Sequence, residues 1–445
     1  MQNYHKHTSY SNVLVTDCAA SYEEYIQRAV ELGQNVISSV EHGYQGNYYV
    51  PYELVQKHND KLLKDVESGL LTKEQFEKKK LKFVFGAEAY WVKDRLAEYS
   101  KIDKKTGKEI PNEFVKDRTN CHIILLAKNE EGRRDINEIL SVASIDGFYG
   151  QPRIDINLLL HVKPENIMVT TACLKYWAYN DIDEITEKLY RHFKDNFFLE
   201  IQYHNTDIQK KINKRIIDLH DKFGIKLILG CDSHYIYPDQ YKERDNYLEA
   251  RGITYDEDEQ GWYMDYPDEQ EARRRLKEQG ILTDEQIDEC IKNTDILLDF
   301  DDIVLNKNIK LPKNYLFNGE WVGDKSQEWR DTTLHNLVYS KWNEIKNTVS
   351  PERYKEYKDG IEYELNAIID TKMADYFLID YELVKTGVEN GGIITKTGRG
   401  SGVSYYVNSL LGFSNIDRFI SPVKLYPDRF ISKTRILKTK SLLKT

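Results

Sequence analysis

Short apolar runs recur along the first part of the chain, and polar, amphipathic segments separate them. Runs of this kind predict buried strands, and they cover residues 35–40, 82–90, 121–128, 166–173, 197–202 and 226–234. The segments between the runs predict helices. Near-continuous apolar strands that alternate with helices are typical of a parallel sheet covered on both faces. At least six such units favour a β/α barrel over two small sheets.

The clearest helix prediction covers residues 21–33. Ser21 and Glu24 form a capping-box pattern at its start, and Gly33 marks its end. The lysine-rich stretch 72–82 reads as the solvated face of another helix.

The character of the sequence changes near residue 240, where Tyr, Asp and Glu become dominant. A helix is predicted over 282–300, and a less regular segment then leads to further helical patterns and to the glycine-rich "IITKTGRGSG". We therefore divide the chain into a barrel (1–250), a helical connector (251–326) and a second unit (327–445). The fold class expected is α/β.

Composition limits the class of protein but does not identify it. The 445 residues are 40% hydrophobic, and no stretch approaches the roughly 18 apolar residues of a membrane span. The N-terminus shows no secretory signal, and five scattered cysteines favour reduced thiols in a cytoplasm. The net charge of −10 means that any nucleic-acid binding depends on local basic patches. We therefore expect a soluble, cytoplasmic protein without a membrane partner.

The stretch "YHKHTSYS" (4–11) places His5 and His7 one residue apart on what reads as the first strand. Side chains at i and i+2 of a strand point to the same side, so the two imidazoles can converge on a divalent transition metal. Taken alone, a short His-x-His near a terminus is more often a solvated surface motif than a metal site.

Further candidate ligands stand at strand ends, where parallel α/β folds place their reactive groups. They are His42, Glu88, Cys173, Asp232 and His234, with His122 at the start of its run and Asp17 within reach of the first turn. Each has an ordinary structural explanation, such as a buried imidazole or a capping carboxylate. Together with His5 and His7, nine ligands exceed the needs of one tetrahedral zinc, so the set predicts a cluster of two or three metals.

The order of these motifs resembles the polymerase and histidinol phosphatase (PHP) domain. The matching stretches are "HKHTSYS", "EHG" (41–43), "GAEAY" (86–90), "CHIILLAK", "TACL" (171–174) and "CDSHY" (231–235). "GFYGQPRID" (147–155) and "FFLEIQYHN" (197–205) resemble that domain in the alpha subunits of bacterial or phage DNA polymerase III, the C-family replicative polymerases. The resemblance implies a distorted seven-stranded (β/α) barrel.

The resemblance also implies roles for individual residues. Metal binding carries over to His5, His7, His42, Glu88, His122, Cys173, Asp232 and His234, and to Asp17 if a short insertion precedes it. Glu41 stands where the family normally has Asp. His7, Asp232 and His234 are expected to be catalytic, with two or three zinc or manganese ions. The implied reaction is hydrolysis of phosphodiesters or phosphate esters, which in some members serves 3′–5′ proofreading.

The second unit contains the glycine-rich turn of "IITKTGRGSG" (393–402), read as a strand, a turn and a helix beginning near Ser404. Such a turn lets the backbone approach phosphates, although it is often only a tight connection. It resembles the palm motif that holds the incoming dNTP, with Gly398, Arg399, Gly400 and Ser401 as the triphosphate-binding residues and Mg²⁺ as the ion. The expected fold is an incomplete α+β palm with helical segments.

Polymerisation in this family uses an Asp-x-Asp pair, and the sequence has no acid after Asp428. We therefore expect that this chain alone cannot extend a primer. The partners implied are a DNA primer-template, dNTP, a missing C-terminal polymerase part, the sliding clamp and an exonuclease subunit.

Two other functions fit parts of the sequence. One is a stand-alone phosphoesterase for a small ester, against which the palm-like motif counts. The other is a structural module that docks an exonuclease or a second polymerase chain, and metal content discriminates that case.

Overall fold

The computed structural model describes residues 1–13, 17–103, 105–253, 262–306 and 311–442. The chain forms two compact units, Met1–Val304 and Leu305–Thr445, and each is described here by itself. The division falls within the expected connector (251–326), and its helices α9 (Glu269–Gln279) and α10 (Asp284–Lys292) belong to the first unit.

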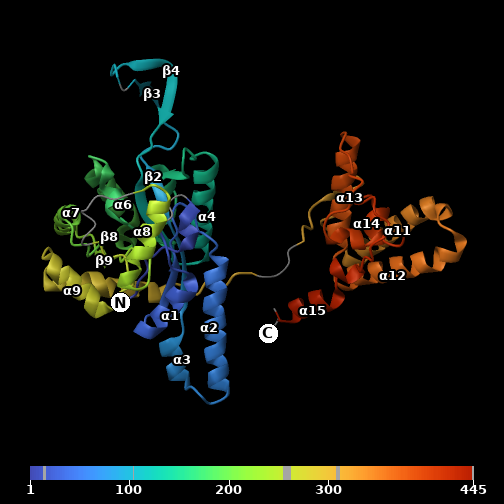
Figure 1. Cartoon of the computed structure of the whole chain (residues 1–445), viewed down its shortest axis with the longest axis horizontal. Coiled ribbons are helices and arrows are strands. Elements are labelled where there is room, and N and C mark those ends of the chain that lie inside the picture. The colour runs from blue at the N-terminus through green and yellow to red at the C-terminus, as the bar shows by residue number, and fades with distance from the viewer. Residues whose placement is uncertain (14–16, 104, 254–261, 307–310, 443–445) are drawn as a thin grey trace. The chain divides into compact units, whose positions relative to one another are not determined.

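The first unit is built on a curled seven-stranded sheet (Figure 1). Its strands are β1 (Val36–Ser39), β2 (Lys82–Val92), β5 (Cys121–Ala127), β6 (Arg153–Asp155), β7 (Ile167–Thr170), β8 (Phe197–Ile201) and β9 (Leu227–Leu229). Six of them confirm the apolar runs of the sequence. The strand order is β1-β2-β5-β7-β8-β9, and β6 pairs with β2 outside this path.

The sheet is mixed, so the expectation of an all-parallel sheet was wrong. β5 runs antiparallel to both β2 and β7, whereas the other neighbours are parallel. The cause lies in the connection between β2 and β5, which contains the hairpin of β3 (Glu98–Ile102) and β4 (Glu109–Lys116) and no crossover helix. Without such a crossover the chain returns in the opposite direction. In Figure 1 this hairpin stands out from the body of the first unit.

The N-terminal segment lies between the two edges of the curled sheet. It is not the full strand that the sequence predicted, because only Lys6 forms a bridge, to Ser233. The Ser233 amide donates to the carbonyl of His5, and the amide of His7 donates to the carbonyl of Ser233. On the other side, Ser38 Oγ donates to the carbonyl of Tyr4 at 2.5 Å. These contacts bring the opening residues into the wall of the half-barrel.

Helices cover the outside of this sheet. Besides α9 and α10 they are α1 (Tyr22–Leu32), α2 (Tyr49–Glu67), α3 (Lys73–Lys79), α4 (Glu130–Ile145), α5 (Ile156–Leu159), α6 (Ile182–Phe193), α7 (Asp207–Phe223) and α8 (Tyr241–Ala250). Short 3-10 helices are η1 (Ser9–Val13), η2 (Leu174–Ala178), η3 (Lys194–Asn196), η4 (Pro238–Gln240) and η6 (Asn293–Asp299). The predicted capping box of Ser21 and Glu24 and the left-handed stop at Gly33 are both present in α1. Helix α3 has no buried residue, as its lysine-rich sequence predicted.

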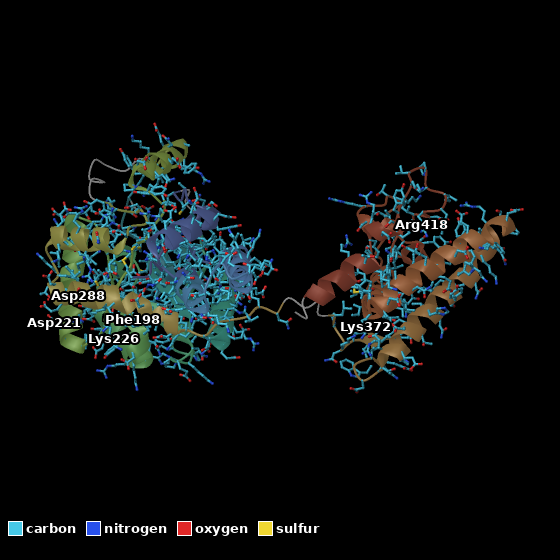
Figure 2. All side chains as sticks on the ribbon, turned by 90° about the horizontal axis from the view of Figure 1, so that it is seen from below. Phe198, Asp221, Lys226, Asp288, Lys372 and Arg418 are labelled. Carbon is cyan, nitrogen blue, oxygen red and sulfur yellow. The ribbon has the colours of Figure 1, made fainter. Side chains whose placement is uncertain are left out.

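The inside of the curl is apolar at one end. Val84, Ile124, Phe198 and Ile228 meet there from four strands (Figure 2 labels Phe198). Because side chains alternate along a strand, residues two or four positions further on share this inner face. That face therefore continues from a packed core towards the strand ends that carry the candidate ligands.

The second unit is mostly helical in the residues that the structure describes. Its α-helices are α11 (Gln327–Ile345), α12 (Tyr354–Asp370), α13 (Ala374–Glu389), α14 (Tyr406–Leu410) and α15 (Lys433–Leu442). Its 3-10 helices are η7 (Lys346–Thr348), η8 (Pro351–Arg353), η9 (Ser401–Ser404) and η10 (Pro427–Arg429), and its only described hairpin joins β10 (Leu316–Phe317) to β11 (Glu320–Trp321). The core gathers Val338, Trp342, Ile361, Phe377 and Val407 from four of the α-helices.

The strand expected at 393–397 does not form, and Ile393 is 89% exposed. A β-branched run becomes a strand only when a neighbouring strand pairs with it, and the described part of this unit offers none. The helix expected near Ser404 is instead the 3-10 turn η9 followed by the five residues of α14. Among the described helices of the chain, none combines the length and apolar character that crossing a bilayer requires.

Candidate metal centre

The sheet brings the predicted ligands together at one edge. His42 follows β1, Cys173 follows β7, and Asp232 and His234 follow β9, while Glu88 lies inside β2. His122 stands at the start of β5, opposite to the strand end at which the sequence predicts ligands. Because β5 is antiparallel, its first residues lie beside the last residues of β2, with His122 opposite Tyr90 and Ile124 opposite Glu88.

His5, His7 and Asp232 form the first group of possible ligands. Nε2 of His5 and Nε2 of His7 lie 3.2 Å apart, and each lies close to Oδ1 of Asp232, at 3.2 and 3.3 Å. All three side chains are buried. Glu88 lies beside this group, 3.5 Å from Nε2 of His5 and 3.6 Å from Nε2 of His7.

His42, Glu88 and His122 form the second group. Oε2 of Glu88 lies 2.5 Å from Nδ1 of His42, and Oε1 lies 3.0 Å from Nδ1 of His122. Sγ of Cys173 lies 3.5 Å from the same Nδ1 of His122. Glu88 therefore stands between the two groups, and Cys173 extends the second.

His234 and Asp17 continue the cluster from the other side of His7. The rings of His7 and His234 lie 4.9 Å apart between centroids, and Nε2 of His234 lies 3.6 Å from Oδ2 of Asp17. His7, His42 and His234 also form a group of their own. All nine residues that the sequence singled out thus lie in one contiguous cluster.

Nδ1 of His5 and Nδ1 of His7 each donate a hydrogen bond to another group. Nδ1 of His5 lies 2.7 Å from the Glu200 carboxylate, which only accepts. Nδ1 of His7 lies 3.1 Å from Oγ of Ser11, whose own proton goes to Glu41. In the neutral rings both Nε2 atoms therefore present lone pairs, and these face each other and two carboxylates. Lone pairs gathered in this way repel unless a cation or a proton lies between them.

Glu200 and Glu41 are functional residues that sequence reasoning missed as part of the site. Besides His5, Glu200 accepts hydrogen bonds from Tyr4 (2.6 Å), Gln202 (2.9 Å) and Thr170 (3.1 Å). Only the period-2 pattern of "FFLEIQ", which puts Glu200 on the inner face with Phe198, could have indicated it.

Glu41 acts on the cluster through His7. Besides Ser11, it accepts from Oγ1 of Thr8 and from the hydroxyl of Tyr22, both at 2.6 Å. Its carboxylate therefore holds the Ser11 hydroxyl that orients the His7 ring. The PHP family normally has Asp at this position. In this chain both oxygens of the longer Glu41 side chain accept hydrogen bonds.

His204 is a further buried imidazole near the cluster, at the end of β8. Its Nδ1 accepts from the backbone amide of Tyr263 at 3.1 Å, and its ring lies 4.6 Å from that of Trp262. Burial lowers the pKa of His204 to about 3. Nothing in its sequence context separates it from an ordinary core histidine.

Electrostatics keeps the carboxylates ionised. Burial by itself raises the pKa of Glu88, but the neighbouring His122 and His42 outweigh it and hold the pKa well below its usual range. The same balance lowers the pKa of Asp232, through His5 and His7. Burial and the neighbouring His42 lower the pKa of His7 to about 3, so its ring stays neutral. Metal binding needs ionised carboxylates and neutral imidazoles. The ring of His7 is already neutral. For His5 and His42, burial acts to lower the pKa, but Glu200 and Asp232 beside His5 and Glu88 beside His42 outweigh it and raise the pKa, so these rings release a proton when a metal binds.

Two backbone positions at the site are strained. Asp232 has φ of 48° and Ala172, just before Cys173, has φ of 50°. Side chains other than glycine rarely adopt this left-handed region, and such outliers cluster at functional sites. Here they turn the chain after β7 and β9 so that Cys173 and Asp232 face the cluster.

The residues present fit divalent metal ions. Both carboxylate oxygens of Glu88, Nδ1 of His42 and Nε2 of His122 are buried without a hydrogen bond of acceptable geometry among the described residues. A buried carboxylate in that state is costly unless a cation neutralises it. The mixture of imidazole, carboxylate and thiol suits zinc or manganese, and the overlapping groups suit two or three ions.

The expected triphosphate site of the second unit is less developed. Gly398, Arg399, Gly400 and Ser401 are all exposed, and the α-helix that follows is only five residues long. Gly398 is needed for packing, because a Cβ there would lie 2.7 Å from a side-chain atom of Val403. Gly400 adopts φ of 86°, which a glycine accommodates without strain.

Comparison with known proteins agrees with this architecture. The family model described as "PHP domain" matches residues 3–204, and the model described as "Bacterial DNA polymerase III alpha NTPase domain" matches residues 332–438. The DNA polymerase III alpha subunit of Aquifex aeolicus is 25% identical over 97% of this chain and 35% of its own length. That of Helicobacter pylori is 26% identical over 97% of this chain and 34% of its own length.

A third relative, the alpha subunit of Campylobacter jejuni, is 26% identical over 80% of the chain and 30% of its own length. The chain thus spans about a third of the length of the curated relatives it matches. The two matched regions follow the two units of the structure in order. The chain therefore carries a PHP domain followed by a region that matches the NTPase domain, and over nearly its whole length it is similar to DNA polymerase III alpha subunits.

Proposed function

We propose that the first unit is a metal-dependent phosphoesterase that hydrolyses phosphodiester bonds at DNA 3′ ends, in the manner of a 3′–5′ proofreading exonuclease. The observation that carries this proposal is the convergence of eight buried imidazole and carboxylate groups, with the half-buried thiol of Cys173 beside them, at one edge of the sheet. Two or three divalent ions bound there would polarise a phosphoryl oxygen and make bound water a nucleophile near neutral pH.

In this proposal the side chains of the chain itself set the geometry. His5, His7 and Asp232 hold their ligand atoms within 3.3 Å of one another, and Glu200 fixes the ring of His5. Fixed ligands give the ions a defined arrangement, which in-line attack on phosphorus requires. The more exposed members, such as His42 at 8%, mark the side from which a substrate reaches the cluster.

A polynucleotide is a better substrate than a small phosphate ester because the relationship extends beyond the PHP domain. The alpha subunits of Aquifex and Helicobacter align along 97% of the chain, and their name states DNA synthesis. We therefore propose a primer-template and dNTP with Mg²⁺ as ligands of the polymerase that this chain represents in part, and a cytoplasmic setting. The sliding clamp and an exonuclease subunit are further proposed partners.

The experiment compares two substrates and two variants. The chain is loaded with Mn²⁺ or Zn²⁺ and given a 5′-labelled primer-template or p-nitrophenyl phosphate. We expect stepwise shortening of the primer and little hydrolysis of the small ester. His7→Ala and Asp232→Asn should each abolish the shortening, because each removes one ligand from a cluster that shares its ions.

The matched control is Glu187→Gln, which changes a carboxylate on the surface of α6 that pairs with Arg191. It should leave the rate unchanged. Shortening that survives both His7→Ala and Asp232→Asn at the original rate would place the activity elsewhere. Faster hydrolysis of the small ester than of DNA would favour the stand-alone phosphoesterase.

A further inference from the structure

A second thiol lies in the metal cluster beside Asp17. Sγ of Cys18 lies 3.3 Å from Oδ1 of Asp17, and the thiol side chain is buried, with 1% exposure. Asp17, Cys18 and His234 form a group whose ligand atoms all lie within 4.8 Å of one another. Cys18 is not among the nine residues that the sequence singled out.

The short turn that carries Asp17 and Cys18 is held in place by Asn12. Oδ1 of Asn12 accepts from the backbone amides of Asp17 (3.1 Å) and Cys18 (3.0 Å), and its amide nitrogen donates to the carbonyl of Cys18 at 2.8 Å. The next amide, of Ala19, donates to the carbonyl of His234 at 3.0 Å. These four bonds fix the thiol and the carboxylate on the same side as the imidazole.

The hydrogen bonds of His234 show that its free nitrogen is an acceptor. Its Nδ1 lies 2.9 Å from the carbonyl oxygen of Asp232, and a carbonyl can only accept. In the neutral ring Nε2 therefore has a lone pair, and this lone pair faces Oδ2 of Asp17 at 3.6 Å. Two acceptors that face each other in a buried place repel unless a cation or a proton lies between them.

The buried thiol of Cys290 has different surroundings. Cys290, on α10, donates to the carbonyl of Ile287 within its own helix at 3.3 Å and behaves as a small apolar side chain. Cys18 instead faces a carboxylate and an imidazole. Thiol, carboxylate and imidazole within reach of one point are the donor set that zinc accepts.

We propose that Cys18 is a metal ligand, which together with Asp17 and His234 forms a thiolate-containing position of the cluster that prefers zinc to manganese. This inference rests on the proposed metal centre and gives it a second thiolate, at a different place from Cys173. Thiolate is a soft ligand that zinc accepts readily, whereas manganese favours oxygen ligands. Each metal-binding position of the cluster then has its own preference for zinc or manganese, which depends on whether a thiolate is among its ligands.

The test uses Co²⁺ in place of zinc, because thiolate ligands give cobalt a charge-transfer band in the near ultraviolet. The unmodified chain, Cys18→Ser, Cys173→Ser and Cys290→Ser are loaded and compared at equal protein concentration. We expect Cys18→Ser and Cys173→Ser each to lose about half of the band, and Cys290→Ser to keep all of it. Elemental analysis should show about one zinc fewer per chain in Cys18→Ser, with manganese loading unchanged.

The Cys173→Ser variant keeps the test decisive even if Cys18→Ser does not fold. If its charge-transfer band persists at about half intensity, a second thiolate binds the metal, and the Cys18 thiol is the one placed for it. If the band disappears completely in Cys173→Ser while cobalt stays bound, Cys18 is not a metal ligand. That result would leave the metal centre itself in place. An unmodified chain that binds no cobalt would overturn the metal centre and the proposed function with it.

Discussion

Replacing Glu200 by Gln should weaken metal binding although Glu200 is not expected to touch a metal. Its two oxygens accept four hydrogen bonds, from Tyr4 (2.6 Å), His5 (2.7 Å), Gln202 (2.9 Å) and Thr170 (3.1 Å). Glutamine has nearly the same shape but replaces one oxygen by a donor. The amide nitrogen would turn towards the hydroxyls of Tyr4 and Thr170, which can accept, and its oxygen would stay with His5.

The variant therefore removes the negative charge and keeps the fold. Without that charge the His5 ring is a weaker base and is less firmly oriented, so its Nε2 binds a cation less well. Loss of such a supporting carboxylate costs about 10- to 100-fold in metal affinity, which corresponds to roughly 1.4–2.7 kcal/mol. Circular dichroism should be unchanged, because no buried volume is lost.

The assay is competition for Zn²⁺ with a chromophoric chelator, on the unmodified chain, Glu200→Gln and the surface control Glu187→Gln. Glu187 pairs with Arg191 on α6 and should have no effect. An affinity of Glu200→Gln within twofold of the unmodified chain would refute the reasoning, since it would mean that His5 does not depend on its carboxylate partner. Reduced affinity in the Glu187 control as well would indicate a general charge effect.

Two further predictions concern stability. The metal-free chain should lose stability both below and above about pH 6.5. On the acid side, burial lowers the pKa of His7 and of His204 to about 3 in the folded chain. Acid therefore favours the unfolded chain, in which these rings bind protons more readily. Burial also acts to lower the pKa of His5, but Glu200 and Asp232 outweigh it and raise the pKa. The stabilisation from His5 is therefore lost as pH rises through that raised pKa. The melting temperature of the chelator-treated chain, measured below and above about pH 6.5, checks the acid and the alkaline effect. In the second unit, Asp375→Ala should cost about 3–5 kcal/mol in chemical denaturation, because the Asp375 carboxylate is fully buried 2.6 Å from Nε of the buried Arg330.

The Asp375→Ala prediction has a matched control. Asp359→Ala removes an exposed carboxylate that pairs with Lys355 on α12 and should change the unfolding free energy by less than about 1 kcal/mol. An Asp375→Ala variant as stable as this control would show that Arg330 does not depend on its buried partner. A melting temperature that stays constant or rises as pH falls from 6.5 to about 4 would contradict the acid effect.

Hydrophobic patterning predicted the strands of the first unit well because their burial is encoded locally. Six apolar runs became β1, β2, β5, β7, β8 and β9, and the capping box of α1 is where its residues indicate. Strand direction is not encoded locally. The reversal of β5 depends on the β3–β4 hairpin, whose polar strands lack the apolar signature, and this reversal is what brings His122 to the other ligands.

The sequence predicted those residues of the site whose side chains are uncommon and metal-binding, and it did not predict those whose side chains are common. Histidines and a cysteine at strand ends stand out in any sequence, but Glu200 and Glu41 are acids among 73 acidic residues. Their roles appear only when the sheet brings Tyr4 and Ser11 against them. The strand expected at 393–397 failed for a related reason, because pairing depends on a neighbour that a local pattern does not reveal.

The central claim is that the edge of the PHP sheet holds a multinuclear metal cluster. The most direct test is elemental analysis of the purified chain after loading with zinc and manganese and extensive removal of weakly bound ions. The account predicts two or three tightly held ions per chain, and fewer in His7→Ala and Asp232→Asn. Less than about one ion per chain, even after loading, would contradict it, because the buried lone pairs of Glu88, His42 and His122 would then have to be neutralised in some other way.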